Sequence, residues 1–533
     1  MKQNLTSFLF LLAPILLFAQ AEKFYSSDQI QEIRIQFQAD NWKYLLDSLR
    51  FNGEELLEGS VSINGATAMQ GAGVRYRDGR SFTPNGKRNG IFVDLGENSF
   101  GDYQTMDLSS ALRDPSLVRE VLASEIARTY FDAPQANYAK VFINDEYYGL
   151  FINKEAVGAG YLQRVFGNAN GNLVMPQSDP SEIVPEGCNK KVYGSLQYEE
   201  ASACNENNWL VAQGDLSPVS TLAKALSSGD QSRLSGLLDI DATLWMLAYN
   251  NVLVNLNAYT GQYANNYYLY QTADGTITPI LGDLNLAFGS FKNTGEGASD
   301  LTTPALLTLN PSLHRGNEQR PLISTLLGNE LYYKQYLANM RLILVEWVLS
   351  GKLENRAKAL QTMLAEARQE DAGQYYTTEE FGQSLQETIG RRSRIPGLVA
   401  FMNRRASFLQ GTEVYTLLPP EVTDVAVEGR ERFSSTQLEE FRIHAKIDGY
   451  PKNVYLYYRL TGQADFQATS MLDDGNHYDG EAGDAVFGAV VKPTAGEQGI
   501  EYYFMVENAK TVSYSPSHYN FERYSTTLRE VNK

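Results

Sequence analysis

Cysteine and histidine, which bind zinc or act in many hydrolases, are scarce in this chain: its 533 residues include 2 Cys and 4 His. Cys188 and Cys204 have no histidine between them, so they lack the spacing of a zinc site. The sequence contains no Gly-x-Ser-x-Gly or His-Glu-x-x-His motif and no Walker-type phosphate loop. These absences argue against zinc enzymes, hydrolases of these types and P-loop NTPases.

Positive charge is also in deficit, because 45 Lys and Arg face 63 Asp and Glu, which gives a net charge of −18. Nucleic-acid binding needs clustered Lys and Arg to neutralise phosphates, so this balance argues against a nucleic-acid partner. The content of hydrophobic residues, 43%, is that of a folded globular protein. The length is sufficient for two or three domains with a large core.

Long apolar runs are missing after the N-terminus. The run Phe8–Phe18 follows Lys2 and precedes the small-residue segment Ala19-Gln20-Ala21, which is the order of a signal peptide. This run is too short to span a bilayer, and no later segment reaches the roughly 20 apolar residues of a transmembrane helix. We therefore expect residues 1–20 to be a signal peptide and the protein to be exported, as a secreted, periplasmic or cell-surface protein that does not span the membrane.

Export also bears on the two cysteines, which lie in a polar segment of the chain. An oxidising compartment favours a disulfide between Cys188 and Cys204 over two free thiols. We expect this bond to close a short loop.

Strand patterns dominate the first part of the chain and helical periodicity follows, which is typical of an α+β fold. A helix is expected to begin at Pro115, with Asp114 as its cap. The predicted strands are Ile30–Phe37, Gly59–Ile63, Gly73–Tyr76, Ile91–Leu95, Tyr138–Ile143 and Tyr148–Asn153. The later helical segments are Pro218–Leu226, Gln231–Leu238, Ala242–Val254, Arg320–Gln369 and Gly390–Leu409.

The pattern changes again at the prolines of Leu417–Pro420. Short alternating strands follow, such as Phe441–Ile447 and Val454–Leu460, and no helical period is visible. Many short strands with turn signals between them predict a β-sandwich. We therefore expect a second, all-β domain over residues 417–533.

The most informative segment lies between Asn251 and Gly289. Two strand-like segments, Tyr267–Gln271 and Thr276–Leu281, are joined by an Asp-Gly turn, and Asp283 follows the second of them. Protein kinases place a metal-binding Asp after such a hairpin, and magnesium prefers one or two carboxylates plus phosphates. The alternative is an Asp that caps a turn, which the local pattern alone favours.

Several motifs in this order resemble the CotH kinase family, a group of secreted protein-kinase-like proteins. The motifs are Gly73–Phe82, Asp114–Glu120, Tyr148–Val157, Gly171–Leu173, Asn266–Tyr270 and Asp283–Gly289. The resemblance covers roughly residues 30–410 and implies an atypical protein-kinase-like domain over residues 21–416. It also implies an enzyme that uses ATP with Mg²⁺ or Mn²⁺ to phosphorylate Ser or Thr on a secreted or surface protein.

The resemblance implies roles for individual residues. Asp283, Asn285 and Asn266 would hold the metal. The nucleotide would be held by Arg75, Arg80, Ser81, Lys87 and Glu155. Glu155 could pair with Arg75 or Lys87, as kinases pair a Lys with a Glu, or it could form a surface salt bridge; Lys154 is expected to face solvent.

Three departures from the family pattern bear on catalysis. Asn257 stands where the family has the Asp that would take the acceptor proton, Asn285 replaces a second carboxylate, and Gly282 replaces a Trp. An amide is no general base, and loss of such a base lowers rates by roughly 10²–10⁴-fold. We expect a weak kinase; the alternative is an inactive pseudokinase that acts as an extracellular binding or scaffold protein.

The segment Met471–Val491 resembles an immunoglobulin-like module that often follows such domains. Its carboxylates are closely spaced: Asp473, Asp474, Asp479 and Asp484. They could ligate calcium, but a hairpin rich in Asp-Gly turns explains them as well and is the favoured interpretation.

Overall fold

The structure is a computed structural model that describes residues 23–53, 55–77, 82–177, 183–297, 299–371, 373–431, 438–493 and 499–527. The expected signal peptide, residues 1–20, lies outside the described residues, as do Arg80 and Ser81. The chain divides into two compact units. The first comprises residues 1–128, 132–325 and 343–407, and the second residues 129–131, 326–342 and 408–533.

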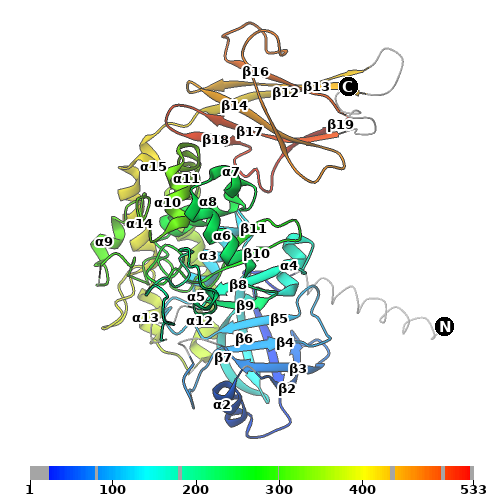
Figure 1. The fold of residues 1–533 in the computed structure, drawn as a ribbon. Helices are drawn as coiled ribbons and strands as arrows, with labels where there is room; N and C mark the ends of the chain where they lie inside the picture. Colours follow the sequence, from blue (N-terminus) through cyan, green and yellow to red (C-terminus); the bar gives the residue numbers. More distant parts are fainter. Residues whose placement is uncertain are drawn as a thin grey trace, which may run out of the picture. The chain divides into compact units, whose positions relative to one another are not determined.

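The first unit begins with a closed seven-stranded barrel (Figure 1). Its strands follow the order β1-β2-β3-β4-β5-β7-β6, and parallel pairing of β1 with β6 closes it. The strands are β1 (Ile30–Gln36), β2 (Leu57–Ile63), β3 (Met69–Tyr76), β4 (Ile91–Asp94), β5 (Thr105–Ser109), β6 (Ala136–Ile143) and β7 (Glu146–Glu155). The α+β class is confirmed, whereas barrel closure and β5 were not predicted.

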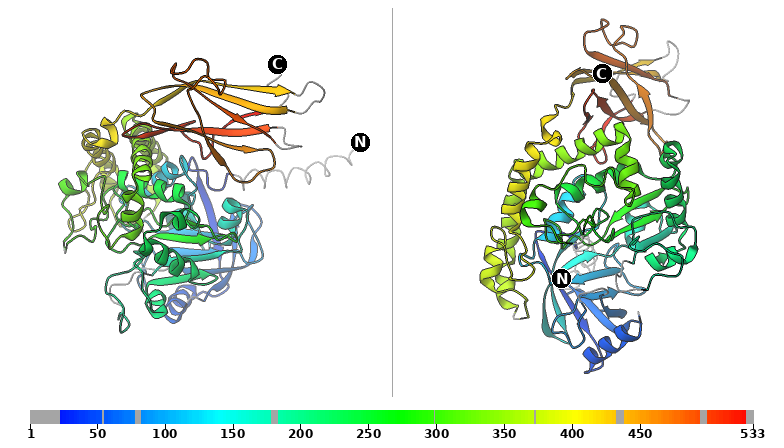
Figure 2. Two further views of the ribbon diagram at one scale, coloured as in Figure 1. Left: turned by 45° about the horizontal axis from the view of Figure 1, so that its top comes forward. Right: turned by 60° about the vertical axis from the view of Figure 1, so that its left-hand side comes forward.

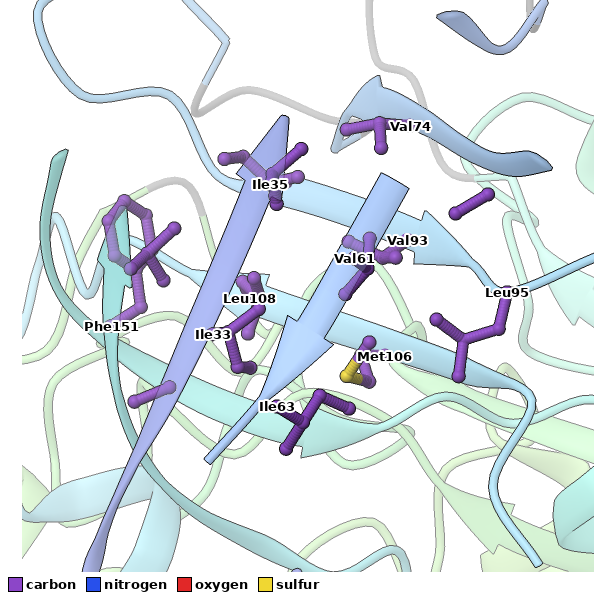
Figure 3. Packing of buried hydrophobic residues seen from close by; sticks show 14 of the residues in the cluster. Ile33, Ile35, Val61, Ile63, Val74, Val93, Leu95, Met106, Leu108 and Phe151 are labelled. Atoms are coloured by element: carbon purple, nitrogen blue, oxygen red, sulfur yellow. The ribbon is translucent and has the colours of Figure 1, made fainter. Parts of the chain in front are cut away.

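Apolar side chains at every second strand position fill the interior of this barrel. Ile33 and Ile35 on β1 are fully buried, and Val61 and Ile63 on β2 pack with them (Figure 3). Side chains that point to one face in every second position are what a strand with one buried face requires. The barrel therefore has its own core, and its strand ends are free to carry polar groups.

Helix α3 (Arg119–Arg128) lies between β5 and β6 in the chain. It begins later than the predicted start at Pro115, because Leu117 has a left-handed backbone with φ 58° and residues 114–117 form a turn closed by the Leu117 N–H on the Asp114 carbonyl. The predicted cap is present in a different form: Asp114 accepts hydrogen bonds from the backbone N–H of Ser116 (2.9 Å) and of Arg119 (2.8 Å).

A second, four-stranded sheet has the order β11-β10-β8-β9. Its strands are β8 (Asn172–Pro176), β9 (Trp209–Gln213), β10 (Tyr267–Gln271) and β11 (Ile277–Leu281). The predicted hairpin is confirmed, with Tyr267 opposite Leu281 in the antiparallel β10–β11 pair. The expected disulfide is also present, since Cys188 and Cys204 are bonded with their Cα atoms 5.5 Å apart.

Helices make up most of the remaining first unit (Figure 2). Asp239 caps α8 by accepting from the backbone N–H of Ala242, and α8 is buried along nearly its whole length. These helices are α2 (Trp42–Asn52), α4 (Ala159–Phe166), α5 (Ser202–Asn208), α6 (Ser217–Ser228), α7 (Gln231–Ser235), α8 (Ile240–Val252), α9 (Thr303–Leu307), the π-helix η1 (Leu344–Leu349), α12 (Lys352–Glu370) and α13 (Thr378–Gln383). Helices α10 (Pro321–Gly328) and α14 (Leu398–Gln410) each cross a boundary between the units.

The second unit contains two sheets that share one hydrophobic core. Figure 1 shows them as two layers of strands. One is β12 (Glu421–Glu431), β13 (Leu438–Asp448) and β16 (Val486–Val491); the other is β15 (Gln467–Ser470), β14 (Asn453–Leu460), β17 (Gly499–Glu507) and β18 (Val512–Ser515), with β19 (Tyr524–Thr527) paired to β17. Helix α15 (Glu413–Thr416) and all of α11 (Glu330–Ile343) except its last residue also belong to the second unit. Its relation to immunoglobulin-like modules stays a prediction.

The acidic residues of the Met471–Val491 segment bind backbone groups. Asp479 is fully buried and accepts from the N–H groups of Asp474, Gly475 and His477. Asp473 accepts from two further backbone N–H groups in the same segment. These bonds support the interpretation of a turn-rich hairpin.

Among the described residues, no helix is both long enough and apolar enough to cross a bilayer.

Candidate active site

Asp283 stands two residues beyond the end of β11, at a point where the chain passes very close to Asn266. The backbone N–H of Gly282 donates to the carbonyl of Asn266 (2.9 Å). A Cβ at position 282 would lie 2.6 Å from that carbonyl group, so no side chain fits. This contact explains why position 282 is a glycine and not the Trp of the family pattern described above. It also fixes the direction in which Asp283 leaves the strand.

Two cations from the barrel hold the Asp283 carboxylate. Lys154, at the end of β7, donates to Oδ1 over 2.6 Å, and Arg77, just after β3, donates to the same oxygen over 3.1 Å. The Lys154 side chain is 6% exposed, whereas that of Asp283 is 29% exposed. The carboxylate is therefore the most accessible charge of this group.

Two further carboxylates complete the cluster. Asp107 on β5 lies directly opposite Lys154 in the β5–β7 ladder and binds the Arg77 guanidinium, with Nη2 at 2.7 Å from Oδ2. Glu120 on α3 is 3% exposed, and both of its oxygens accept from the backbone N–H of Leu284 at 3.0 Å. Glu120 thus holds the residue that follows Asp283.

The pKa values in this cluster follow from burial and charge pairing. Burial acts to raise the pKa of Asp283, but the Lys154 ammonium and the Arg77 guanidinium outweigh it and hold that pKa below its usual value. Burial raises the pKa of Glu120 to about 7, although Lys154 lowers it. Asp283 is therefore ionised at neutral pH, whereas Glu120 is only partly so.

These residues border a cavity of about 390 Å³. Its polar wall contains Arg75, Arg77, Asp107, Lys154, Asn265, Asn266 and Asp283. Its apolar wall is formed mainly by the second sheet and contains Val157, Met175, Pro176, Leu210 and Ala212. The cavity has the size and the mixed lining of a small-molecule site.

The structure brings three of the predicted site residues to this cavity. Asp283, Asn266 and Arg75 line it, and Arg75 also stacks over the ring of Phe92 at 4.8 Å. Asn285 is half-buried, and its Oδ1 has no hydrogen-bond partner among the described residues.

Other predicted site residues lie elsewhere. Asn257 is 9% exposed and is not among the described residues that line the cavity, but its carbonyl accepts from Asn266 Nδ2 (3.1 Å). Lys87 is exposed. The partner of Glu155 is Arg164, which binds both carboxylate oxygens at 2.9 and 2.7 Å.

Sequence reasoning missed the cations that contact Asp283. The expectation that Lys154 faces solvent was wrong, because β7 is buried along its last seven residues and leaves its side chain no route to water. Arg77, Asp107 and Glu120 were not singled out. A usable signal exists for Arg77, since this charged residue directly follows the predicted strand Gly73–Tyr76.

A strand Lys, a helix Glu and a metal-binding Asp after a hairpin are the elements that protein kinases combine. Lys154 on a strand, Glu120 on a helix and Asp283 after a hairpin make an arrangement that is similar to that of protein kinases. The family model described as "CotH kinase protein" matches residues 68–409, more than half of the chain. The chain belongs to the CotH kinase family. Comparison with curated proteins gave no significant match.

Proposed function

We propose that this protein is an exported atypical protein kinase that transfers a phosphoryl group from ATP to Ser or Thr of a secreted or surface protein, with Mg²⁺ or Mn²⁺. The observation that carries the proposal is the Asp283 carboxylate, held by Lys154 and Arg77 at the edge of a cavity of about 390 Å³. Family membership supports the use of a nucleotide and a metal in general.

The cavity offers cations for phosphates and an apolar wall for a base. Arg75 on β3, Arg77 just after β3 and Lys154 on β7 all line this cavity. Because phosphoryl transfer depends on positioning and on stabilising the charge of the phosphates, such a set of cations is what the reaction requires. Met175 and Leu210 provide apolar surface on the other side.

A divalent cation fits the donor set around Asp283. The carboxylate is ionised and accessible, Asn266 lines the same cavity, and Asn285 Oδ1 is a buried oxygen without a hydrogen-bond partner in the described part of the chain. Such oxygens are the ligands that Mg²⁺ takes, alongside phosphates and water. When bound, the cation would neutralise phosphate charge; Asp283 would be its one charged ligand from this set.

Catalysis should be slow, because among the described residues of the cavity no free carboxylate is available as a base. The carboxylates among the described cavity residues, Asp107 and Asp283, are both bonded to Arg77. Asn257, an amide, is no general base. Loss of a base typically costs roughly 10²–10⁴-fold in rate, so residual transfer by positioning alone is expected.

The lack of a catalytic base among the described cavity residues also favours a second candidate function. If positioning does not suffice, the domain is a pseudokinase, and the protein acts as an extracellular binding or scaffold protein. The burial of Asn257 outside the described cavity lining supports this alternative.

Transfer of radiolabelled phosphate from ATP to a generic protein acceptor, with Mg²⁺ or Mn²⁺, tests the proposal. Asp283→Ala is expected to lower incorporation by roughly 10²-fold or more, because the metal loses its charged ligand. Asp102→Ala removes an exposed carboxylate and serves as the matched control. Equal incorporation by wild type and Asp283→Ala would refute the assignment of Asp283.

A thermal-shift titration separates the two candidate functions. A ligand that binds only the folded state must raise the melting temperature. A shift with ATP and Mg²⁺ that needs Asp283, together with measurable transfer, identifies the kinase. A shift without transfer identifies a nucleotide-binding pseudokinase, and no shift at millimolar nucleotide identifies a scaffold.

A further inference from the structure

A small loop in the first unit presents three arginines to solvent. Backbone hydrogen bonds between Ile389 and Ile395, at 2.9 and 2.8 Å, close this loop, and both isoleucines are buried. Arg391, Arg392 and Arg394 stand between them and are all exposed. The loop is therefore anchored at its base while its cations point outward. We refer to Arg391, Arg392 and Arg394 as the arginine loop.

The arginine loop is attached to the segment that follows Asp283. Lys292 Nζ donates to the carbonyls of Ser393 (2.9 Å) and Arg394 (3.0 Å). Arg119 is fully buried and donates to the carbonyls of Ala287 (3.1 Å) and Pro396 (2.5 Å). Two separate contacts thus connect the loop to residues 283–292, on which the candidate metal site is built.

Positive charge accumulates at this place in an otherwise acidic protein of net charge −18. Lys292 and the exposed Arg113 extend the arginine loop, and both Arg394 and Arg113 are close enough to lower the pKa of Lys292, which burial lowers most and Asp300 raises. Between described residues, the three loop arginines form no ion pair. Their charge is available to a partner.

Building on the proposed kinase function, we propose that the arginine loop, with Lys292 and Arg113, docks an acidic segment of the acceptor polypeptide beside its target Ser or Thr. A spread of exposed cations over separate segments matches an extended chain with several carboxylates better than one compact anion, which needs converging donors. The net charge of −18 disfavours binding of such a chain to the protein as a whole, so a local group of exposed cations would direct it to this place.

Fluorescence anisotropy tests docking with a labelled peptide in which Glu residues flank a single Ser. The matched peptide has Gln in place of Glu. The triple variant Arg391→Glu/Arg392→Glu/Arg394→Glu should weaken binding of the Glu peptide by roughly tenfold at low salt and leave the Gln peptide unaffected. The control variant Lys190→Glu/Lys191→Glu/Lys224→Glu makes the same charge change at exposed lysines.

The outcomes are decisive without phosphotransfer. Equal loss of binding in the two triple variants, or no loss in the loop variant, overturns the docking proposal. Stronger competition by a sulfated polysaccharide than by unlabelled peptide of equal charge also overturns the polypeptide as the occupant. Should the Glu peptide bind through the loop while no phosphate is transferred, docking stands and the kinase proposal fails.

If transfer occurs, kinetics add a second criterion. The loop variant should raise KM for the Glu peptide with kcat unchanged, because docking contributes to ground-state and transition-state binding alike. The neutral variant Arg391→Gln/Arg392→Gln/Arg394→Gln should behave in the same direction with a smaller effect. An unchanged KM in both variants overturns the proposal.

Discussion

Lys154 sets the charge balance of the candidate site. It is buried, it binds Asp283 Oδ1 at 2.6 Å, and it faces Asp107 across the β5–β7 ladder. Burial lowers the pKa of its ammonium, but Asp283 and Glu120 outweigh burial and raise it, so Lys154 stays charged. Burying this cation costs desolvation energy, which its acidic neighbours offset.

At this scale we predict that Lys154→Met abolishes the ATP-induced rise in melting temperature and lowers transfer by roughly 10²-fold or more, because the cavity loses a buried cation that would bind the phosphates. Differential scanning fluorimetry and the radiolabel assay measure both effects. Lys140→Met is the control, since Lys140 stands on the neighbouring strand β6 in a partly exposed pair with Glu370. A wild-type response in Lys154→Met would refute the role of Lys154.

Single residues show where sequence reasoning succeeds. Asp283 and Asn266 could be brought together from the sequence, because a two-strand hairpin fixes its own register over a few residues. Arg77 and Lys154 could not be paired with Asp283, since their contacts join residues from the barrel to residues more than a hundred positions later. Such contacts depend on how sheets pack, which no local pattern encodes.

At the scale of elements, the polar loop between α8 and β10 is fixed by hydrogen bonds from two side chains that lie later in the chain. His314 Nε2 donates to the carbonyl of Thr260 (3.0 Å), and Arg320 Nη2 donates to that of Gly261 (2.8 Å). The same loop contains Asn257, whose carbonyl binds Asn266. His314 and Arg320 therefore support a loop that forms part of the candidate site.

His314 should make stability depend on pH. Burial lowers the pKa of its imidazole, Arg320 lowers it further, and Glu296 raises it in part. Because the folded-state pKa is below the unfolded value, the neutral ring stabilises the fold above pH 6.5, and this stability is lost as pH falls. Urea unfolding at several pH values should show a steeper loss below pH 6.5 in wild type than in His314→Gln. Identical slopes would contradict this assignment.

Elements also differ in how far the sequence predicts them. The β10–β11 hairpin was predicted because an Asp-Gly turn separates two short apolar strands. Barrel closure was not, since it needs the parallel pairing of β1 with β6, in which Ile33 lies opposite Val141. No turn connects two strands so far apart in the chain.

At the scale of the whole molecule, the second unit gathers separate parts of the chain. Helix α11 belongs to it, and Lys334 on this helix binds Glu507 on β17 at 2.7 Å. Glu507 is 8% exposed and also accepts from Asn453 Nδ2 at 2.6 Å. The pair thus ties a helical segment to the C-terminal sheets, a grouping that local composition does not indicate.

We predict that Lys334→Met lowers the free energy of unfolding by about 2–3 kcal/mol, because it leaves the Glu507 carboxylate buried without its cation. Denaturant unfolding measures this change. Lys358→Met removes the lysine of an exposed pair with Glu354 and should change stability by no more than about 0.5 kcal/mol. Similar losses in the two variants would show that the Lys334–Glu507 pair is no stronger than a surface pair.

The shared use of Asp283 Oδ1 by Lys154 and Arg77 has a consequence for how ligands assemble in the cavity. A metal ion without nucleotide competes with Lys154 and Arg77 for that oxygen, so the metal alone should bind with low affinity. Phosphates that attract Lys154 would free Asp283 Oδ1 for the metal. By thermodynamic linkage, the bound metal would then raise the affinity for the nucleotide by the same factor. Metal and nucleotide should therefore bind with positive cooperativity, so that each ligand raises the affinity of the cavity for the other.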